Sequence, residues 1–182
     1  MKYIIASDIH GSAHWCDELM KIFHRENADK LILLGDLLYH GPRNPLPDGH
    51  NPQKVFATLN AVKDKIIAVR GNCDSEVDQM VLEFPCLADY AILAHGEKTI
   101  FITHGHLFNA ENPPLLQAGD LLLNGHFHEP CHKLLPNGAF YINDGSVALP
   151  KANTPHSCLL LDENELSWID LSTGAVFDSI KI

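Results

Sequence analysis

A run of four apolar residues, Leu31 to Leu34, ends abruptly at Gly35-Asp36, and this junction limits the possible folds more than any other stretch. A short apolar run with such an end is typical of a buried strand. A carboxylate at the mouth of a hydrophobic strand is costly unless a cation meets it, and the chain has few basic residues to offer. We therefore interpret Asp36 as a carboxylate shared by two metal ions. The alternative is a helix N-cap or a turn aspartate, which accounts for most isolated Gly-Asp pairs.

Length and composition indicate one domain spanning residues 1–182. The chain is long enough to bury a core, and its apolar content of 46% and charged content of 20% are ordinary for a globular protein. No apolar run reaches membrane-spanning length, and the N-terminus enters a strand too soon to be a signal peptide. We expect a cytoplasmic protein with no membrane partner.

Charge and cysteine content narrow the function classes. The formal net charge is −10, and only Arg25, Arg43 and Arg70 supply guanidinium groups, so we expect no binding to a nucleic-acid backbone. An acidic enzyme can still hold a phosphate where metal ions supply positive charge locally. The five cysteines are odd in number and include no CxxC pair, which indicates neither a disulfide framework nor a zinc ribbon.

Strands and helices alternate in the first half of the chain, and strands dominate the second. The predicted order is a strand at 2–7, a helix around 15–23, a strand at 30–35, a helix from Pro52, a strand at 65–70 and a short helix at 75–83. A hairpin at 90–103 and strands at 121–124, 139–143, 157–161, 166–171 and 175–180 follow. The predicted fold class is therefore α/β, with two packed sheets and helices outside them.

Side chains of metal-binding type follow the ends of five predicted strands: Asp8, His10, Asp36, Asn72, His104, His126 and His128. In open α/β sheets, ligands bind at the carboxyl edge of the strands, so this placement predicts one site there. In Asp8-Ile9-His10 and His126-Phe127-His128, an extended backbone would turn the two outer residues the same way. Carboxylate, imidazole and amide oxygen together favour Mn, Fe or Zn over Ca, and the absence of Cys₂His₂ spacing disfavours a closed structural zinc site.

The same residues form ordered motifs. Asp8-x-His10, Gly35-Asp36, Gly71-Asn72, His104-Gly105-His106 and Gly125-His126-x-His128 resemble the five blocks of the calcineurin-like metallophosphoesterases. The resemblance runs from Met1 to the region of Pro150 and is strongest to the small bacterial and archaeal phosphodiesterases of the YfcE type. It implies a four-layer αββα sandwich of two mixed β-sheets flanked by helices.

The resemblance also implies a dinuclear site. Asp8, His10, Asp36 and His128 would hold one divalent cation, and Asp36, Asn72, His104 and His126 the other, with Asp36 bridging. Manganese is the expected metal, with zinc or iron as alternatives. Two cations about 4 Å apart would bind the phosphate oxygens and lower the pKa of a bridging water, so that hydroxide attacks a phosphodiester. Asn72 would ligate through its oxygen and leave its NH₂ group facing the phosphate.

Three further residues are candidates for substrate contact. Many family members have His after the Gly-Asn pair, where it meets the phosphate or protonates the leaving oxygen. This chain has Cys73 there, a weaker donor with an ordinary pKa near ~8.5. We therefore expect a preference for diesters with acidic leaving groups, unless Cys73 is only a small spacer. Arg43 is a candidate phosphate clamp and His106 a candidate substrate contact; an exposed loop arginine and a turn histidine are the alternatives.

The leading function is thus a metal-dependent phosphodiesterase that acts on a small diester. One alternative is a protein-interaction scaffold like the retromer subunit that resembles this family, which would show eroded ligands and a large exposed apolar patch. The other is a phosphomonoesterase, although the chain is short for the inserts of such enzymes. The hairpin at 90–103 also offers an edge for a homo-oligomer.

Overall fold

The computed structural model describes residues 1–182 and contains eleven strands, three α-helices and one 3-10 helix. The strands are β1 Tyr3–Ala6, β2 Lys30–Leu33, β3 Ile66–Ala68, β4 Tyr90–His95, β5 Lys98–Thr103, β6 Leu121–Asn124, β7 Cys131–Leu134, β8 Phe140–Asn143, β9 Ser157–Asp162, β10 Glu165–Asp170 and β11 Val176–Lys181. The helices are α1 Ala13–Arg25, α2 Pro52–Asn60, the 3-10 helix η1 Lys63–Lys65 and α3 Glu76–Gln79. This order confirms the predicted alternation in the first half and the excess of strands in the second.

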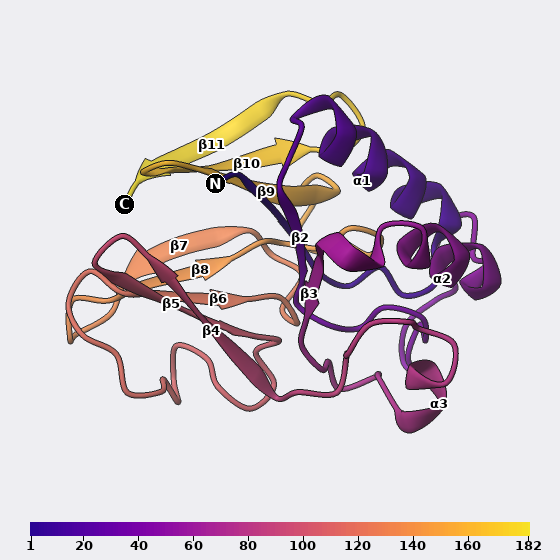
Figure 1. The fold of residues 1–182 in the computed structure, drawn as a ribbon, viewed down its shortest axis with the longest axis horizontal. Helices are drawn as coiled ribbons and strands as arrows, with labels where there is room; N and C mark the ends of the chain where they lie inside the picture. The colour runs from indigo at the N-terminus through magenta and orange to yellow at the C-terminus, as the bar shows by residue number, and fades with distance from the viewer.

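Two mixed sheets face each other (Figure 1). The six-stranded sheet has the order β11-β10-β9-β1-β2-β3, with β1, β2 and β3 parallel and the other pairs antiparallel. The five-stranded sheet has the order β4-β5-β6-β8-β7, with β5, β6 and β8 parallel and both outer strands antiparallel to their neighbours. In both sheets the central strands are therefore parallel, and their carboxyl ends define one edge each.

Alternation along β1 and β2 divides the core into two layers. Ile4 and Leu31 face the helices, whereas Ile5 and Ile32 lie in the cluster between the two sheets. Successive side chains of a strand point to opposite faces, so a strand covered on both sides must be apolar at every position. This double burial explains why the apolar run before Gly35 is continuous rather than alternating.

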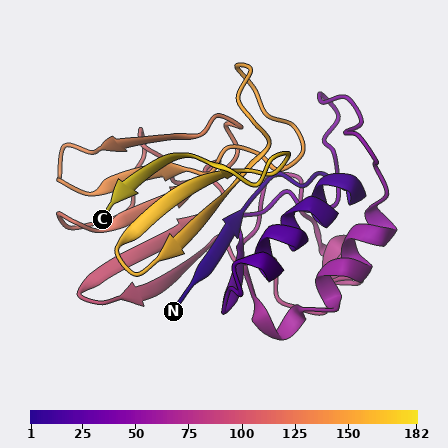
Figure 2. The same cartoon turned by 90° about the horizontal axis from the view of Figure 1, so that it is seen from above.

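Helices lie against the outer face of the six-stranded sheet on the side of β1 to β3, whereas β11 at the other edge has no helix over it (Figure 2). Helix α1 begins after Ser12, whose hydroxyl accepts a hydrogen bond from the Trp15 N–H at 3.2 Å. Its buried face, which includes Leu19 and Phe23, belongs to the same cluster as Ile4 and Leu31. The N-cap and the apolar spacing together explain why this segment is a helix that lies on the sheet.

The outer face of the five-stranded sheet is covered by an irregular segment instead of a helix. Phe101 and Leu122 on this face pack with Leu116 in the connection between β5 and β6, and Phe108 from the same connection lies against them. The α/β class with two mixed sheets is confirmed. The fourth layer of the predicted sandwich is made by this connection, because its prolines and its Asn-rich turns interrupt helical periodicity.

One strand was not predicted. Strand β7, Cys131–Leu134, is exposed at all four positions and forms the edge of its sheet. It lacks apolar alternation because neither of its faces is covered, so its pairing with β8 left no pattern in the sequence. No helix of the structure combines the length and apolar character needed to cross a bilayer.

Candidate metal centre

The structure brings all seven candidate ligands together at the carboxyl ends of the parallel strands. Potential ligand atoms of Asp8, His10 and His128 lie within 4.8 Å of one another, and so do those of Asp8, Asp36 and His104. The Asn72 Oδ1 atom lies 3.1 Å from His104 Nε2, and the His126 Nδ1 atom lies 3.2 Å from the same nitrogen. Residues separated by up to 120 positions in the chain thus form one cluster.

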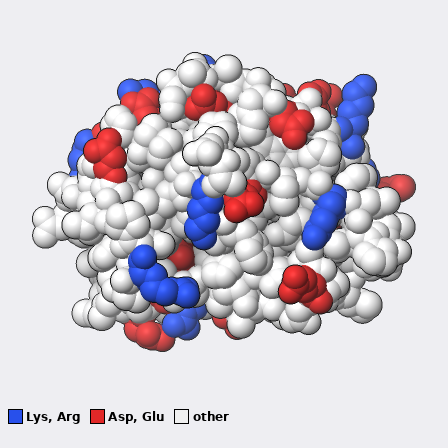
Figure 3. All heavy atoms as spheres, turned by 180° about the vertical axis from the view of Figure 1, so that it is seen from behind, with Lys and Arg blue, Asp and Glu red and all other residues white.

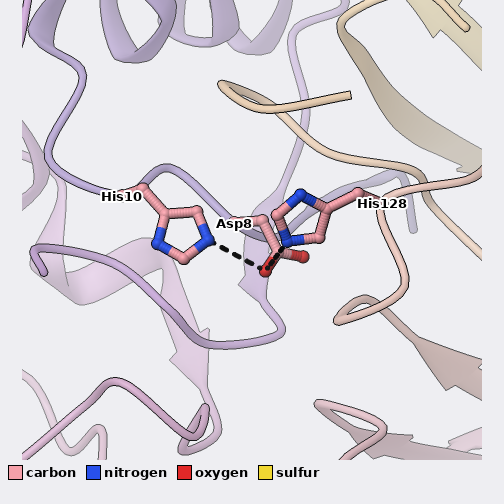
Figure 4. Close-up of side chains that lie close together, drawn as sticks. All are labelled: Asp8, His10 and His128. Carbon is pink, nitrogen blue, oxygen red and sulfur yellow. Dashed lines mark ion pairs between the residues drawn. The ribbon is translucent and has the colours of Figure 1, made fainter. Parts of the chain in front are cut away.

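Asp8, His10 and His128 form what we call the buried half-site (Figure 4). The Asp8 Oδ1 atom lies 3.4 Å from His10 Nε2 and 3.1 Å from His128 Nε2. All three side chains are almost fully buried, with His10 only 1% exposed. The second oxygen of Asp8, Oδ2, accepts hydrogen bonds from the Ser7 hydroxyl and the His126 N–H, so that Oδ1 faces the two imidazoles.

Asn72, His104 and His126 form the open half-site. His104 is buried, but Asn72 is exposed and His126 is half-buried. Asp36 lies between the two half-sites: its Oδ2 atom is 3.8 Å from His10 Nε2 and 3.5 Å from His104 Nε2. Its other oxygen, Oδ1, accepts the Cys73 N–H at 2.8 Å, which directs Oδ2 into the centre.

Backbone carbonyls set the tautomer of three of the four histidines. The Nδ1–H groups donate from His10 to the Tyr39 carbonyl, from His104 to that of Leu34 and from His128 to that of Leu149, at 2.6 to 2.8 Å. With the proton held on Nδ1, each Nε2 keeps its lone pair toward the centre. His126 has no such anchor, because its Nδ1 faces His104.

The backbone around the centre is strained rather than extended. Five of the nine non-glycine residues with positive φ are candidate ligands: Asp8 (57°), His10 (48°), Asp36 (56°), His126 (67°) and His128 (64°). The prediction of extended Asp-x-His and His-x-His triplets was therefore wrong. Left-handed backbone turns His126 toward His104 and His128 toward Asp8, so the two histidines of one triplet serve different half-sites. Such strain persists only where the surrounding structure fixes it, and it concentrates at functional sites.

Asp74 links the loops after β2 and β3, a role that the sequence alone did not reveal. Its carboxylate accepts N–H groups of Asp36, Leu37 and Gly71 at 2.7 to 2.9 Å. Burial raises the pKa of Asp74 to about 6, although these donors oppose the rise, so the group is ionised at neutral pH. Gly71 is required here because a Cβ atom would lie 2.0 Å from Asp36 Oδ1. The Asp in Gly71-Asn72-Cys73-Asp74 was the available signal.

Ser7 links Asp8 to a second buried carboxyl group, Asp144. The Ser7 Oγ lies 2.5 Å from Asp8 Oδ2 and 2.8 Å from Asp144 Oδ1, but a hydroxyl has only one hydrogen. The contact between Ser7 and Asp144 therefore needs a second proton. Burial, followed by the nearby charge of Asp8, raises the pKa of Asp144 well above its ordinary range, so a neutral Asp144 supplies that proton to Ser7.

Burial and neighbouring charges shift the pKa values of side chains differently in the two half-sites. Burial opposes ionisation of Asp8, but the imidazoles of His10 and His128 that face its carboxylate outweigh burial and hold the pKa of Asp8 well below its usual value. Burial would lower the pKa of His10, yet the Asp8 carboxylate that faces its Nε2 atom raises the pKa. In contrast, burial and the neighbouring His104 lower the pKa of His126 to about 4. His126 is therefore neutral at physiological pH, as a metal ligand must be.

Orphaned polar atoms show that the donor set fits a cation. The buried Asp8 Oδ1 and His10 Nε2 atoms have no hydrogen-bond partner, a situation that costs about 1–3 kcal/mol for each group. Both atoms face the space between Asp8, His10 and His128. A divalent cation would satisfy them, and the mixture of imidazole, carboxylate and amide oxygen suits Mn, Fe or Zn.

Comparison with known proteins identifies the family. The family model for the calcineurin-like phosphoesterase superfamily domain matches residues 1–166. The chain belongs to the calcineurin-like phosphoesterase superfamily. It is 45% identical over 182 residues to phosphodiesterase YfcE of Escherichia coli strain K12, covering 100% of this chain and 98% of that protein. Membership in this family implies bound divalent metal ions.

Solved structures agree with the fold. A structure of Yfce, described as a phosphoesterase from E. coli, superposes with a TM-score of 0.96 at 45% identity and covers 100% of both chains. Vps29 of Entamoeba histolytica in complex with Zn²⁺ superposes with a TM-score of 0.60 at 17% identity, covering 100% of this chain and 99% of the other. The second likeness shows that the fold is shared and says nothing of activity.

The three residues predicted to contact substrate do not all lie at the candidate metal centre. Arg43 and Cys73 line a cavity of about 350 Å³ whose walls also include His10, Asp36 and Asn72. The Cys73 sulfur lies with ligand atoms of His10 and Asp36 in a group spanning 4.8 Å. Burial and the Asp36 charge raise the pKa of Cys73 above its ordinary range, so it is a neutral thiol.

His106 does not line this cavity. Its ring centroid lies 5.4 Å from that of His104, and its Nδ1 atom is buried without a hydrogen-bond partner. Burial and the neighbouring His104 lower its pKa. Two residues that do line the cavity, Phe127 and Lys151, were not singled out from the sequence. Lys151 lies outside every motif, so only its position in the fold reveals it.

Proposed function

We propose that this protein is a dinuclear-metal phosphodiesterase that hydrolyses small phosphodiesters. The observation that carries the proposal is the position of Asp36, whose Oδ2 atom lies between a nitrogen of each half-site. A single carboxylate placed in this way suits a bridge between two cations. Family membership and 45% identity to a protein named phosphodiesterase support a phosphoric diester hydrolase.

The chain itself would perform three tasks. Asp8, His10 and His128 would hold one cation and Asn72, His104 and His126 the other, with Asp36 shared. When bound, two divalent cations supply the positive charge that binds phosphate oxygens and makes an attacking water acidic. Asn72, whose NH₂ group lies 3.2 Å from the Cys73 sulfur, and the exposed Arg43 line the same cavity and would orient the phosphate. Manganese is our choice among the metals that suit these donors.

Cys73 would shape selectivity toward the leaving group. A neutral thiol is a weak donor, so it would protonate a departing alkoxide poorly. Diesters with acidic leaving groups, which need no such proton, would therefore react fastest. We would replace Cys73 with His and compare aryl with alkyl esters; an unchanged ratio of rates would count against this role.

The decisive assay measures hydrolysis after reconstitution with Mn²⁺, using matched panels of diesters and monoesters. We expect diester hydrolysis that disappears in Asp36→Asn and persists in Asp178→Asn, a control carboxylate that is half exposed on β11. A wild-type protein that remains inactive on every diester with two bound cations would refute the proposal. Activity restricted to monoesters would favour the phosphomonoesterase alternative.

Features of the surface bear on the other predictions. On the face shown in Figure 3, basic and acidic side chains are interspersed, which fits the predicted lack of nucleic-acid backbone binding. The interaction-scaffold alternative expects eroded ligands, whereas all seven candidate ligands here converge. A cytoplasmic location, a single domain and a homo-oligomer that uses the β4–β5 hairpin stay predictions.

A further inference from the structure

A second cavity adjoins the one above the candidate metal centre. The first has a volume of about 350 Å³ and the second about 430 Å³, and both are lined by Phe127 and Lys151. These two residues therefore stand at the junction between the cavities. A group bound at the metal centre could extend past them into the second space.

The backbone holds Phe127 at this junction. It lies between His126 and His128, both with left-handed backbone, and its N–H donates to the Gly125 carbonyl at 2.7 Å. Its ring contacts the His126 ring edge-on, with centroids 5.1 Å apart, and the residue is 43% exposed. Because Phe127 is partly exposed and lines both cavities, part of its ring is accessible from them.

The charges of the second cavity nearly cancel. Lys133 and Lys151 line it together with Glu111 and Glu129, and neither lysine forms an ion pair. The Lys133 ammonium group lies 5.2 Å from the centroid of the Tyr141 ring. A balanced rim with an exposed aromatic ring favours a neutral, planar group over an anionic one.

The end of the first cavity away from Phe127 adjoins a third space. Cys73 and Asn72 are shared there with a space of about 620 Å³ that Tyr39 and Arg70 also line. Cys73 is where we place the leaving oxygen. A diester has two ester arms, so its retained arm would extend to the Phe127 end.

We propose that the second cavity binds the retained ester arm of the substrate and that this arm is a neutral, planar aromatic group stacked on Phe127. This inference rests on the proposed phosphodiesterase function. It narrows the substrate class to diesters with at least one aromatic arm, and it makes Phe127 the residue that determines specificity.

The test uses p-nitrophenyl phosphodiesters that share one leaving group and differ in the retained arm: methyl, phenyl or 2-naphthyl. The readout is the ratio of kcat/KM for each aryl ester to that for the methyl ester in Mn²⁺-loaded enzyme. We expect Phe127→Leu to lower the phenyl-to-methyl ratio about tenfold, mostly through KM, since aromatic stacking is worth this much. Phe127→Trp should keep the ratio.

Phe177→Leu is the matched control, because Phe177 is 42% exposed on β11 and lines neither cavity. The ratio cancels any disturbance of the adjacent histidines, since both substrates use the same centre. A ratio that stays within twofold of wild type in Phe127→Leu would overturn the inference, as would a Trp variant that loses the preference. Absence of all diester hydrolysis in the wild type would instead refute the proposed function itself.

Discussion

The two half-sites differ in how firmly the protein holds them. In the buried half-site, His10 and His128 are anchored by backbone carbonyls, and Asp8 is fixed through Ser7. In the open half-site, only His104 has a carbonyl anchor, Asn72 is exposed, and His126 is half-buried. Pre-organisation of ligands by outer hydrogen bonds raises metal affinity, so the halves should bind cations unequally.

This difference predicts two kinds of bound cation, one that stabilises the fold and one that exchanges with the solution. A cation in the buried half-site would satisfy the orphaned Asp8 Oδ1 and His10 Nε2 atoms and stabilise the fold. A cation in the open half-site would face the cavity, where substrate arrives. We therefore expect the buried half-site to bind first and the open half-site to respond to the metal concentration.

The largest expected effect is a difference in kcat/KM between alanine variants of two histidines in one loop. His128→Ala should lower kcat/KM by about 1,000-fold, with no recovery in millimolar Mn²⁺, because it removes a ligand of the tight half-site. His126→Ala should lose about 10- to 100-fold and recover much of it as Mn²⁺ rises. Rates measured against Mn²⁺ concentration check both, and a larger, irreversible loss in His126→Ala would reverse the comparison.

The next effect concerns the loop that positions the shared carboxylate. Asp74→Asn should weaken binding at both half-sites by about 10- to 100-fold, because Asp36 loses its backbone anchor. Asp78→Asn is the matched control: Asp78 is also buried and accepts the Ser75 N–H, but it touches no candidate ligand. Isothermal titration with Mn²⁺ measures both variants, and equal affinities in the two would contradict the role of Asp74.

The third effect is a different pH dependence at each half-site. His10 has a raised pKa and must lose its proton to bind a metal, so affinity at the buried half-site should fall as pH drops below that pKa, by up to about tenfold per pH unit. His126, with a pKa of about 4, is already neutral and adds no proton competition between pH 5 and 7, so affinity at the open half-site should fall less steeply. Chelator competition at several pH values separates the two. Parallel pH profiles would argue against the comparison.

The smallest effect tests the support of Asp8. Folding raises the pKa of Asp144. Its contribution to the free energy of unfolding is therefore fully present below the pKa of the unfolded state and is lost as the pH rises through the pKa of the folded state. Asparagine does not ionise, and its NH₂ group can still donate a hydrogen bond to Ser7. Asp144→Asn should therefore stabilise the metal-free protein by about 1–3 kcal/mol at pH 8. The gain should vanish toward pH 4. Urea unfolding at both pH values measures it, and destabilisation at pH 8 would show that Asp144 is ionised.

Much of the architecture was predictable because burial leaves a pattern. The continuous apolar run Leu31 to Leu34 indicated a strand covered on both faces, and the polar residues after it indicated the edge where ligands meet. The convergence of the candidate ligands from five strands followed from this edge. By contrast, β7 carries no apolar alternation, since it is exposed on both faces.

The details of the centre were not predictable, because they depend on backbone dihedrals and distant contacts. The left-handed backbone at His126 and His128 splits one triplet between two half-sites, and local sequence does not reveal it. The Ser7–Asp144 contact spans 137 positions. Phe127 and Lys151 line the cavity only through the fold.

The central claim is that two unequal half-sites meet at Asp36. Crystals grown with Mn²⁺ at substoichiometric and then at saturating concentration, measured with anomalous diffraction, test it most directly. We predict one peak beside Asp8, His10 and His128 at low Mn²⁺ and a second beside Asn72, His104 and His126 only at saturation, with Asp36 contacting both. A saturated crystal with no peak beside Asp8, or with first occupancy at the open half-site, would contradict it.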